Sequence, residues 1–194
     1  MIRLALLATS LTLLAACASA PPQAVHLYQL SAEAQPVAGA SLPYSVGIGP
    51  LKWPEYLNRR QLIIRRDAGS LDTAENDRWA EALDANFERV LRENLARQLN
   101  PQRLQAYPWA LTDVPAINIA IEVQQFDSSI RNETVLRARW RIASRDKKEL
   151  ASERGSEIRI KARDGSPAAA VAAQSEALAR LSEEIGRTLA SVAR

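Results

Sequence analysis

"AINIAIEVQQFD", residues 116–127, places an apolar side chain at almost every second position, and "TVLRARWRIAS", residues 134–144, repeats the alternation shortly afterwards. The two apolar faces consist of Ile117, Ile119, Ile121 and Val123 in the first stretch and Leu136, Ala138, Trp140 and Ile142 in the second. Such alternation is typical of a β-strand with one face buried and the other in water. The short connection between the two stretches predicts an antiparallel hairpin.

The polar face of the second strand carries a basic stripe formed by Arg137, Arg139 and Arg141. Such a stripe is a candidate surface for lipid headgroups. With short loops on both sides of this strand, however, Arg137 is expected to lie between Glu122 and Glu157 on the neighbouring strands. Opposite charges facing each other across strands contribute roughly 0.2 to 1 kcal/mol per pair. We therefore favour a stripe that is neutralised within the sheet over a binding surface.

The rest of the chain predicts further strands and two long helices. Strands are expected over residues 25–32, 44–53 and 60–66, which are short apolar or alternating runs bounded by proline, glycine or charged residues. Helical spacing predicts one helix from Trp79 to Leu99, capped by Asn76 or Asp77 and stopped at Asn100-Pro101. The last helix is expected to begin at Ser166-Pro167, a capping residue followed by proline.

Strands and helices that are segregated along the chain favour an α+β fold. We expect a single domain over residues 25–194, with a mainly antiparallel β-sheet and both long helices packed against it. With 47% hydrophobic residues, the chain can build a substantial core.

The first residues resemble a secretory signal, with Arg3 ahead of an apolar stretch from Leu4 to Leu14. That stretch is shorter than the about 20 apolar residues needed to cross a bilayer. Cys17, the single cysteine in the sequence, follows it and cannot form an intramolecular disulfide. Cleavage within "ACASA" by an ordinary signal peptidase remains an alternative in which Cys17 has no special role.

"LAAC", residues 14–17, resembles the lipobox of bacterial lipoproteins. This resemblance implies a signal peptide over residues 1–16 and a diacylglycerol and an N-acyl chain attached covalently to Cys17. Residues 17–24 would then form the anchor and a short linker. Because neither position 18 nor position 19 is an aspartate, the sorting rules of such lipoproteins imply the outer membrane, on its periplasmic face.

Charge and composition exclude several functional classes. Removing residues 1–16 leaves 24 basic and 22 acidic residues, too small an excess for a protein whose affinity for nucleic acid rests on phosphate neutralisation. A Cys/His metal cage is excluded because the chain has one histidine, His26. No nucleophile elbow, zinc-protease motif or dinucleotide loop is present. We therefore expect a protein that is not an enzyme and needs no metal, although paired carboxylates have no fixed spacing in sequence.

The segment "GPLKWPEYLNRRQLIIRR", residues 49–66, combines prolines with aromatic and arginine residues. Its candidate partner-binding residues are Trp53, Tyr56, Leu57, Arg59 and Arg60. Aromatic residues and arginine are enriched at the hot spots of protein interfaces. The alternative, to which we give equal weight, is a loop whose aromatic side chains cap the core.

Several of these features together resemble the PqiC (YmbA) family of ABC-type transport auxiliary lipoproteins. They are the lipobox, the early "LYQL", "GPLKWPEYLNRRQLIIR" at residues 49–65, "RWAEAL" at residues 78–83 and "NLARQL" at residues 94–99. The resemblance is strongest over residues 49–99. Trp53 and Arg60 depart from the smaller apolar residue and the proline expected at these positions.

The resemblance implies an auxiliary lipoprotein that docks onto an MCE-domain protein of the PqiB type and helps to maintain the envelope. MCE rings or tubes are thought to carry lipids between the two membranes. A ring-shaped partner is compatible with a homo-oligomer. Two other classes stay open: a carrier that holds lipid in its own apolar groove, and a structural envelope lipoprotein without a transport role.

Overall fold

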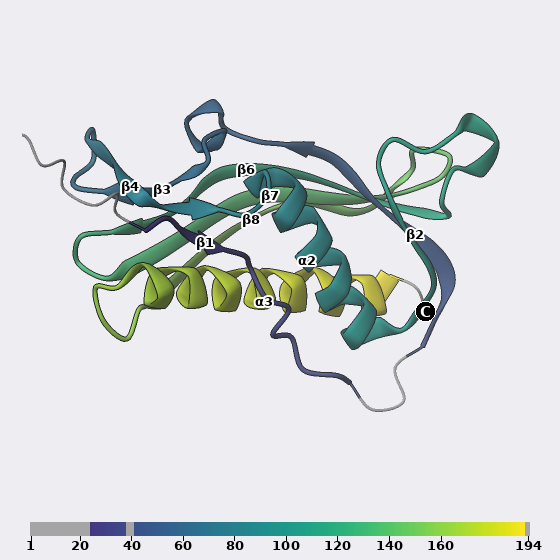
Figure 1. Ribbon diagram of the computed structural model, residues 1–194. Helices are drawn as coiled ribbons and strands as arrows, with labels where there is room; N and C mark the ends of the chain where they lie inside the picture. The colour runs from purple at the N-terminus through teal and green to yellow at the C-terminus, as the bar shows by residue number, and fades with distance from the viewer. Residues whose placement is uncertain (1–23, 38–40, 193–194) are drawn as a thin grey trace, which may run out of the picture.

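The computed structural model describes residues 24–37 and 41–192, which form a sheet covered on one face by two helices (Figure 1). The described strands are β1 (His26–Tyr28), β2 (Leu42–Lys52), β3 (Gln61–Arg65), β4 (Leu71–Trp79), β5 (Pro101–Ala106), β6 (Ile117–Ser129), β7 (Glu133–Ser144) and β8 (Glu149–Lys161). The helices are α2 (Leu83–Leu99) and α3 (Pro167–Val192), and the 3-10 turns are η2 (Glu55–Leu57) and η3 (Leu111–Asp113).

Strand β6 is the centre of the sheet, and the sheet forks beside it. On one side, β6 pairs along its length with β7, which pairs with β8, and both pairings are antiparallel. On the other side, the first half of β6 pairs in parallel with β2, whose far edge carries β5. The end of β6 pairs in parallel with β3, which continues to β4 and β1.

The expectation of a mainly antiparallel sheet is therefore wrong, because the sheet is mixed. Of the seven strand pairings among the described residues, four are parallel: β1 with β4, β2 with β5, β2 with β6 and β3 with β6. Alternation along a strand indicates which face is buried but not the direction of its neighbours. The parallel pairings join segments that are distant in sequence, so no hairpin motif predicts them.

Both long helices are present, although the first begins later than predicted. α2 starts at Leu83, because Asn76, Asp77 and Trp79 belong to β4. It ends where the sequence indicates, with Asn100 in the left-handed conformation at φ 41° and ψ 58°. At the start of α3, the Ser166 hydroxyl accepts a hydrogen bond from the backbone N–H of Ala169 (3.2 Å), as expected for its cap.

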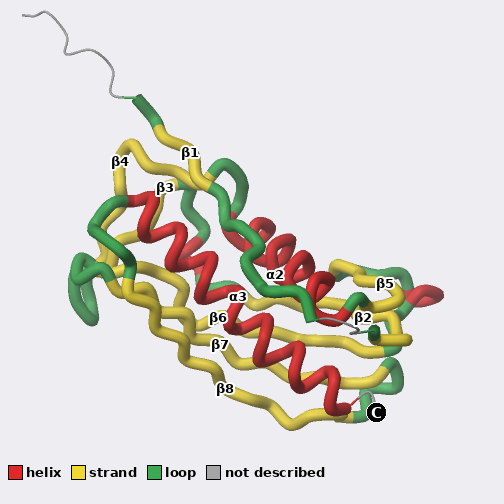
Figure 2. The backbone as a smooth tube through the Cα atoms, turned by 90° about the horizontal axis from the view of Figure 1, so that it is seen from below, coloured by secondary structure: helices red, strands yellow, loops and turns green. Residues whose placement is uncertain are grey.

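The core fills the space between the sheet and the helices. α2 packs on β2 and β5, and α3 packs on β6, β7 and β8, while the helices also contact each other. The side chains buried at this interface include Ile48, Phe87, Leu91, Leu95, Ile119, Leu136, Ile142, Leu178 and Leu181. Figure 2 shows both helices on the same side of the sheet.

A segment that follows β1 lies across the two helices and fixes the start of the domain against them (Figure 2). The buried Asn86 accepts a hydrogen bond from the backbone N–H of Leu30 (3.2 Å), and the buried Asn94 accepts one from Ala34 (3.0 Å). The hydroxyl of Ser175 accepts a third from Ser31 (3.0 Å). Because these backbone groups are satisfied by helix side chains, the segment is held without belonging to the sheet.

Candidate docking surface

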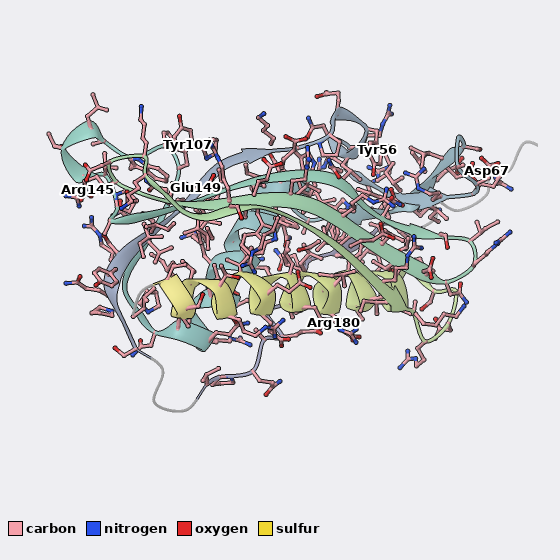
Figure 3. All side chains as sticks on the ribbon, turned by 180° about the vertical axis from the view of Figure 1, so that it is seen from behind. Tyr56, Asp67, Tyr107, Arg145, Glu149 and Arg180 are labelled. Carbon is pink, nitrogen blue, oxygen red and sulfur yellow. The ribbon has the colours of Figure 1, made fainter. Side chains whose placement is uncertain are left out.

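Tyr56, in η2 between β2 and β3, lies on the side of the sheet away from α3 (Figure 3). Trp53 is half-buried and meets Phe87 and Phe126 edge to face, with ring centroids 5.4 and 6.3 Å away. Leu57 in η2 is fully buried. These contacts support the core-capping interpretation for the apolar residues of the segment.

Tyr56 joins a cluster around Asp127, a carboxylate that is only 1% exposed on β6. The phenol oxygen of Tyr56 donates a hydrogen bond to one carboxylate oxygen at 2.7 Å. Arg65 of β3 donates two, from Nε at 2.9 Å and from Nη2 at 2.7 Å, and Gln125 donates a further one at 3.0 Å. The Arg65 guanidinium also lies over the Tyr56 ring, 5.8 Å from its centroid. The cluster thus ties η2 to two strands.

The electrostatics of this cluster keep Tyr56 and Arg65 protonated, as their hydrogen bonds to Asp127 require. Burial, and then the hydrogen bond to Asp127, raises the pKa of Tyr56 above its ordinary value of 10.0, so the phenol stays a donor. The hydrogen bonds to Asp127 raise the pKa of Arg65 further above its usual range. A buried carboxylate is stable only when it is paired and hydrogen-bonded, as Asp127 is here.

We predict that Tyr56→Phe lowers the free energy of unfolding by about 1.5 kcal/mol at pH 8, because one hydrogen bond to a charged group is lost. The raised pKa of Tyr56 contributes stability that is complete below the ordinary pKa of 10.0 and is lost as the pH rises through the folded-state value. Urea unfolding at pH 8 and pH 11 should therefore give a smaller difference between wild type and variant at pH 11. A difference that stays constant contradicts this assignment.

Among the five candidate residues, Arg59 and Arg60 are the two that are exposed to solvent. They line a shallow hollow together with Glu81 and Asp84 near the start of α2. The candidate residues therefore divide into two groups. Trp53, Tyr56 and Leu57 stabilise the domain, whereas the two arginines remain available to a partner.

The basic stripe is neutralised largely as the sequence indicates, although the register differs. Arg137 forms an ion pair with Glu157 (3.0 Å), as predicted, and Arg139 pairs with Glu153 (3.2 Å). Glu122 lies opposite Arg139, not opposite Arg137. Up to Val123, the register between β6 and β7 is displaced by two residues from the expected one, so the side chains of this part keep their predicted faces. A further shift of one residue follows after Val123.

A second exposed loop, residues 107–116, was not singled out from the sequence. The ring of Tyr107 meets that of Trp109 edge to face at 5.1 Å, and Leu111 is 94% exposed. The two aromatic residues on either side of Pro108, followed by Pro115, are the signal that could have drawn attention to it. The loop lies at the end of the sheet opposite the turn that carries Asp67 (Figure 3).

Cys17 and most of the predicted linker lie outside the described residues. Within residues 24–37 and 41–192, no three His, Cys, Asp or Glu side chains are grouped so that they could hold a metal ion. In that same part of the chain, no helix is both long and apolar enough to span a bilayer. His26 lies in β1, exposed, with its ring nitrogen Nδ1 3.3 Å from Asp77.

A comparison with protein families gives a match over residues 28–186 to the ABC-type transport auxiliary lipoprotein component. The chain belongs to this family. The match covers every described strand except the start of β1 and reaches into the second half of α3, so the whole domain is the family's domain. The resemblance inferred from the lipobox and residues 49–99 is confirmed. Membership identifies the chain as a lipoprotein and as an auxiliary component of ABC-type transport.

Solved structures with the same fold include a protein from Xanthomonas campestris, with 15% identity, a TM-score of 0.73 and coverage of 86% of this chain and 96% of that one. A structure described as an uncharacterized protein has 17% identity, a TM-score of 0.68 and coverage of 85% and 98%. A PelC dodecamer from Paraburkholderia phytofirmans has 12% identity, coverage of 77% and 94% and a TM-score of 0.40, too low to support a conclusion about assembly. No curated protein sequence matched the chain.

Proposed function

We propose that the protein is anchored in the outer membrane through acylated Cys17 and docks onto an MCE-domain protein of an intermembrane lipid transport system. The family match over residues 28–186 carries this proposal, since it makes the domain an auxiliary part of a transporter. The arrangement of the domain is compatible with a docking role, because the Asp127 cluster fixes η2 and leaves Arg59 and Arg60 exposed beside it. No catalytic step is needed for this function.

The proposal is tested by chemical crosslinking in the native envelope, followed by mass spectrometry of whatever is attached to the protein. We expect an MCE-domain protein among the major adducts, in outer-membrane fractions. In Cys17→Ser, the anchor is removed, so both the outer-membrane location and the adduct should be lost. A wild-type protein that attaches only to unrelated envelope proteins contradicts the docking role and favours a structural lipoprotein.

Arg59→Glu combined with Arg60→Glu should abolish co-purification with the MCE partner. Truncating a hot-spot residue typically costs at least about 2 kcal/mol, or roughly thirtyfold in affinity, and reversing two charges should cost no less. Because both side chains are exposed, the free energy of unfolding should change by less than about 0.5 kcal/mol. Pull-down and urea unfolding of the same preparation measure the two effects.

The matched control reverses two other exposed charges, Arg145→Glu with Lys148→Glu, in the turn between β7 and β8. This variant has the same change in net charge and should retain the partner. Equal loss of binding in both variants would indicate a general electrostatic effect, and the docking surface would then not be specific to residues 59–60.

A further inference from the structure

A cavity of about 260 Å³ lies at the end of the sheet where β3 and β4 meet the β6–β7 turn and the start of α3. Its walls are mainly apolar. They include Leu62 and Ile64 of β3, Trp79 of β4, Phe126 of β6 and Ala170 of α3. The cavity is therefore part of the interface between the sheet and the helices, opened toward one end of the molecule.

The cavity exists because the sheet is wider than two helices can cover. α2 packs over β2 and β5, and α3 packs over β6, β7 and β8. The helix-facing side of β3 and β4 is covered mainly at its edge, by residues such as Leu83 at the start of α2 and Pro167 at the start of α3. Apolar side chains of β3 thus face a space that no segment of the described chain fills.

The polar groups in the wall are already satisfied within the protein. The Ser128 hydroxyl pairs with Thr134 (2.6 Å), and Gln174 donates to the carbonyl of Phe126 (3.3 Å). Asp164 accepts a hydrogen bond from the backbone N–H of Ser166 (2.8 Å) and lies 3.3 Å from Arg163. Among the described residues, no buried polar atom without a partner belongs to this wall. The cavity therefore offers a ligand apolar contact and little hydrogen bonding.

The cavity opens at the end of the domain that carries the predicted membrane tether. β1 follows that tether directly, and it pairs with β4, placing Tyr28 beside Trp79 in the cavity wall. Exposed apolar side chains occur at the same end of the domain. They are Val25 just before β1, Leu27 in β1, Leu71 at the start of β4 and Ile130 in the turn after β6. Ile130 also lines the cavity. An apolar rim beside a membrane anchor favours contact with lipid.

We propose that this cavity receives the end of one acyl chain of a phospholipid from the membrane in which the protein is anchored. The proposal rests on the proposed function, because a subunit of a lipid transport system meets phospholipid at this membrane. The volume is below the about 300 to 1,000 Å³ of drug-sized sites, so the cavity takes part of one chain while the headgroup stays outside. The acyl chains attached to Cys17 are the alternative source, and the experiment below separates them from free phospholipid.

The test uses the acylated, full-length protein in vesicles of phosphatidylethanolamine and phosphatidylglycerol. A fraction of the phosphatidylethanolamine carries a photoreactive diazirine near the methyl end of one acyl chain. After illumination, the labelled residues are located by mass spectrometry. We expect adducts in residues 62–64, 126–132 and 162–170, which form the cavity wall.

Two variants fill the cavity from opposite walls, Ala170→Phe on α3 and Ala74→Phe on β4. Labelling of the cavity wall should be lost in each variant. Two variants are used because one of them could fail to fold. Ala172→Phe, at an exposed position two residues further along α3, should keep it. Labelling that persists in both filled variants, or that falls only on exposed residues, overturns the proposal.

Cys17→Ser distinguishes the two sources of an acyl chain. We expect it to be labelled at the same positions as the acylated protein when it is mixed with the same vesicles. If Cys17→Ser is labelled and the acylated protein is not, the acyl chain on Cys17 fills the cavity of the acylated protein, and the assignment to phospholipid is overturned. Crosslinking to an MCE-domain protein is measured separately. If the cavity wall is labelled but no MCE-domain protein is crosslinked, the docking function is refuted and the lipid site stands. If an MCE-domain protein is crosslinked but the cavity wall is not labelled, the lipid site is refuted and the docking function stands.

Discussion

Replacing Asp127 with alanine is expected to lower the free energy of unfolding by about 3 kcal/mol or more. Removing one member of a buried ion pair typically costs about 3 to 5 kcal/mol, because the remaining charge stays away from water without a partner. Here the orphaned groups are the Arg65 guanidinium, whose side chain is 23% exposed, and the Tyr56 hydroxyl. Partial access of water to Arg65 places the expected cost near the lower end of this range. Urea unfolding at neutral pH measures it.

Two comparisons separate this mechanism from a general loss of packing. Asp127→Leu combined with Arg65→Met removes both charges and should recover part of the loss, since apolar replacement of a buried pair is often neutral. Glu133→Ala breaks the exposed ion pair with Arg159 (2.8 Å) and should cost no more than about 1 kcal/mol. An Asp127→Ala protein as stable as Glu133→Ala contradicts a structural role for the cluster.

The strands that alternate strictly and the helix with a clear cap were predictable, because their signals are local. β6 and β7 carry apolar side chains at every second position, and Ser166-Pro167 marks the start of α3. β4 and β5 were not predicted. Their sequences, "LDTAENDRW" and "PQRLQA", are mostly polar and only partly buried, so their conformation depends on pairing with neighbours and not on a buried face of their own.

The candidate site was predictable only as a segment. The composition of residues 49–66 indicated an unusual segment, but not which of its side chains would be buried. The decisive residue, Asp127, is separated by 62 positions from Arg65 and by 71 from Tyr56. Their contact depends on the parallel pairing of β3 with the end of β6, and this pairing has no local signature in the sequence. The same long-range pairing creates the uncovered face that forms the cavity.

The loop of residues 107–116 depends on two glycines of β2 in a comparable way. A Cβ atom added at Gly47 would lie 2.4 Å from Cγ of Pro115, and one added at Gly49 would lie 2.3 Å from Cβ of Tyr107. Contacts this short do not occur without movement of one partner, so the loop can lie against β2 only where side chains are absent. Gly49 also has φ of +127°, which side-chain-bearing residues rarely adopt.

Gly49→Ala should therefore lower the free energy of unfolding by roughly 2 to 6 kcal/mol. A residue held in an unfavourable backbone region costs about 1 to 3 kcal/mol, and overpacking costs about 1 to 3 kcal/mol more. Urea unfolding measures the total, and amide hydrogen exchange should locate the change in residues 107–116, because Tyr107 must move away from β2. Gly155→Ala in β8 is the matched control, since a Cβ atom there meets nothing within 4 Å. Its effect should stay within about 0.5 kcal/mol. If the two variants are equally stable, the close approach of the loop to β2 is not what requires glycine at position 49.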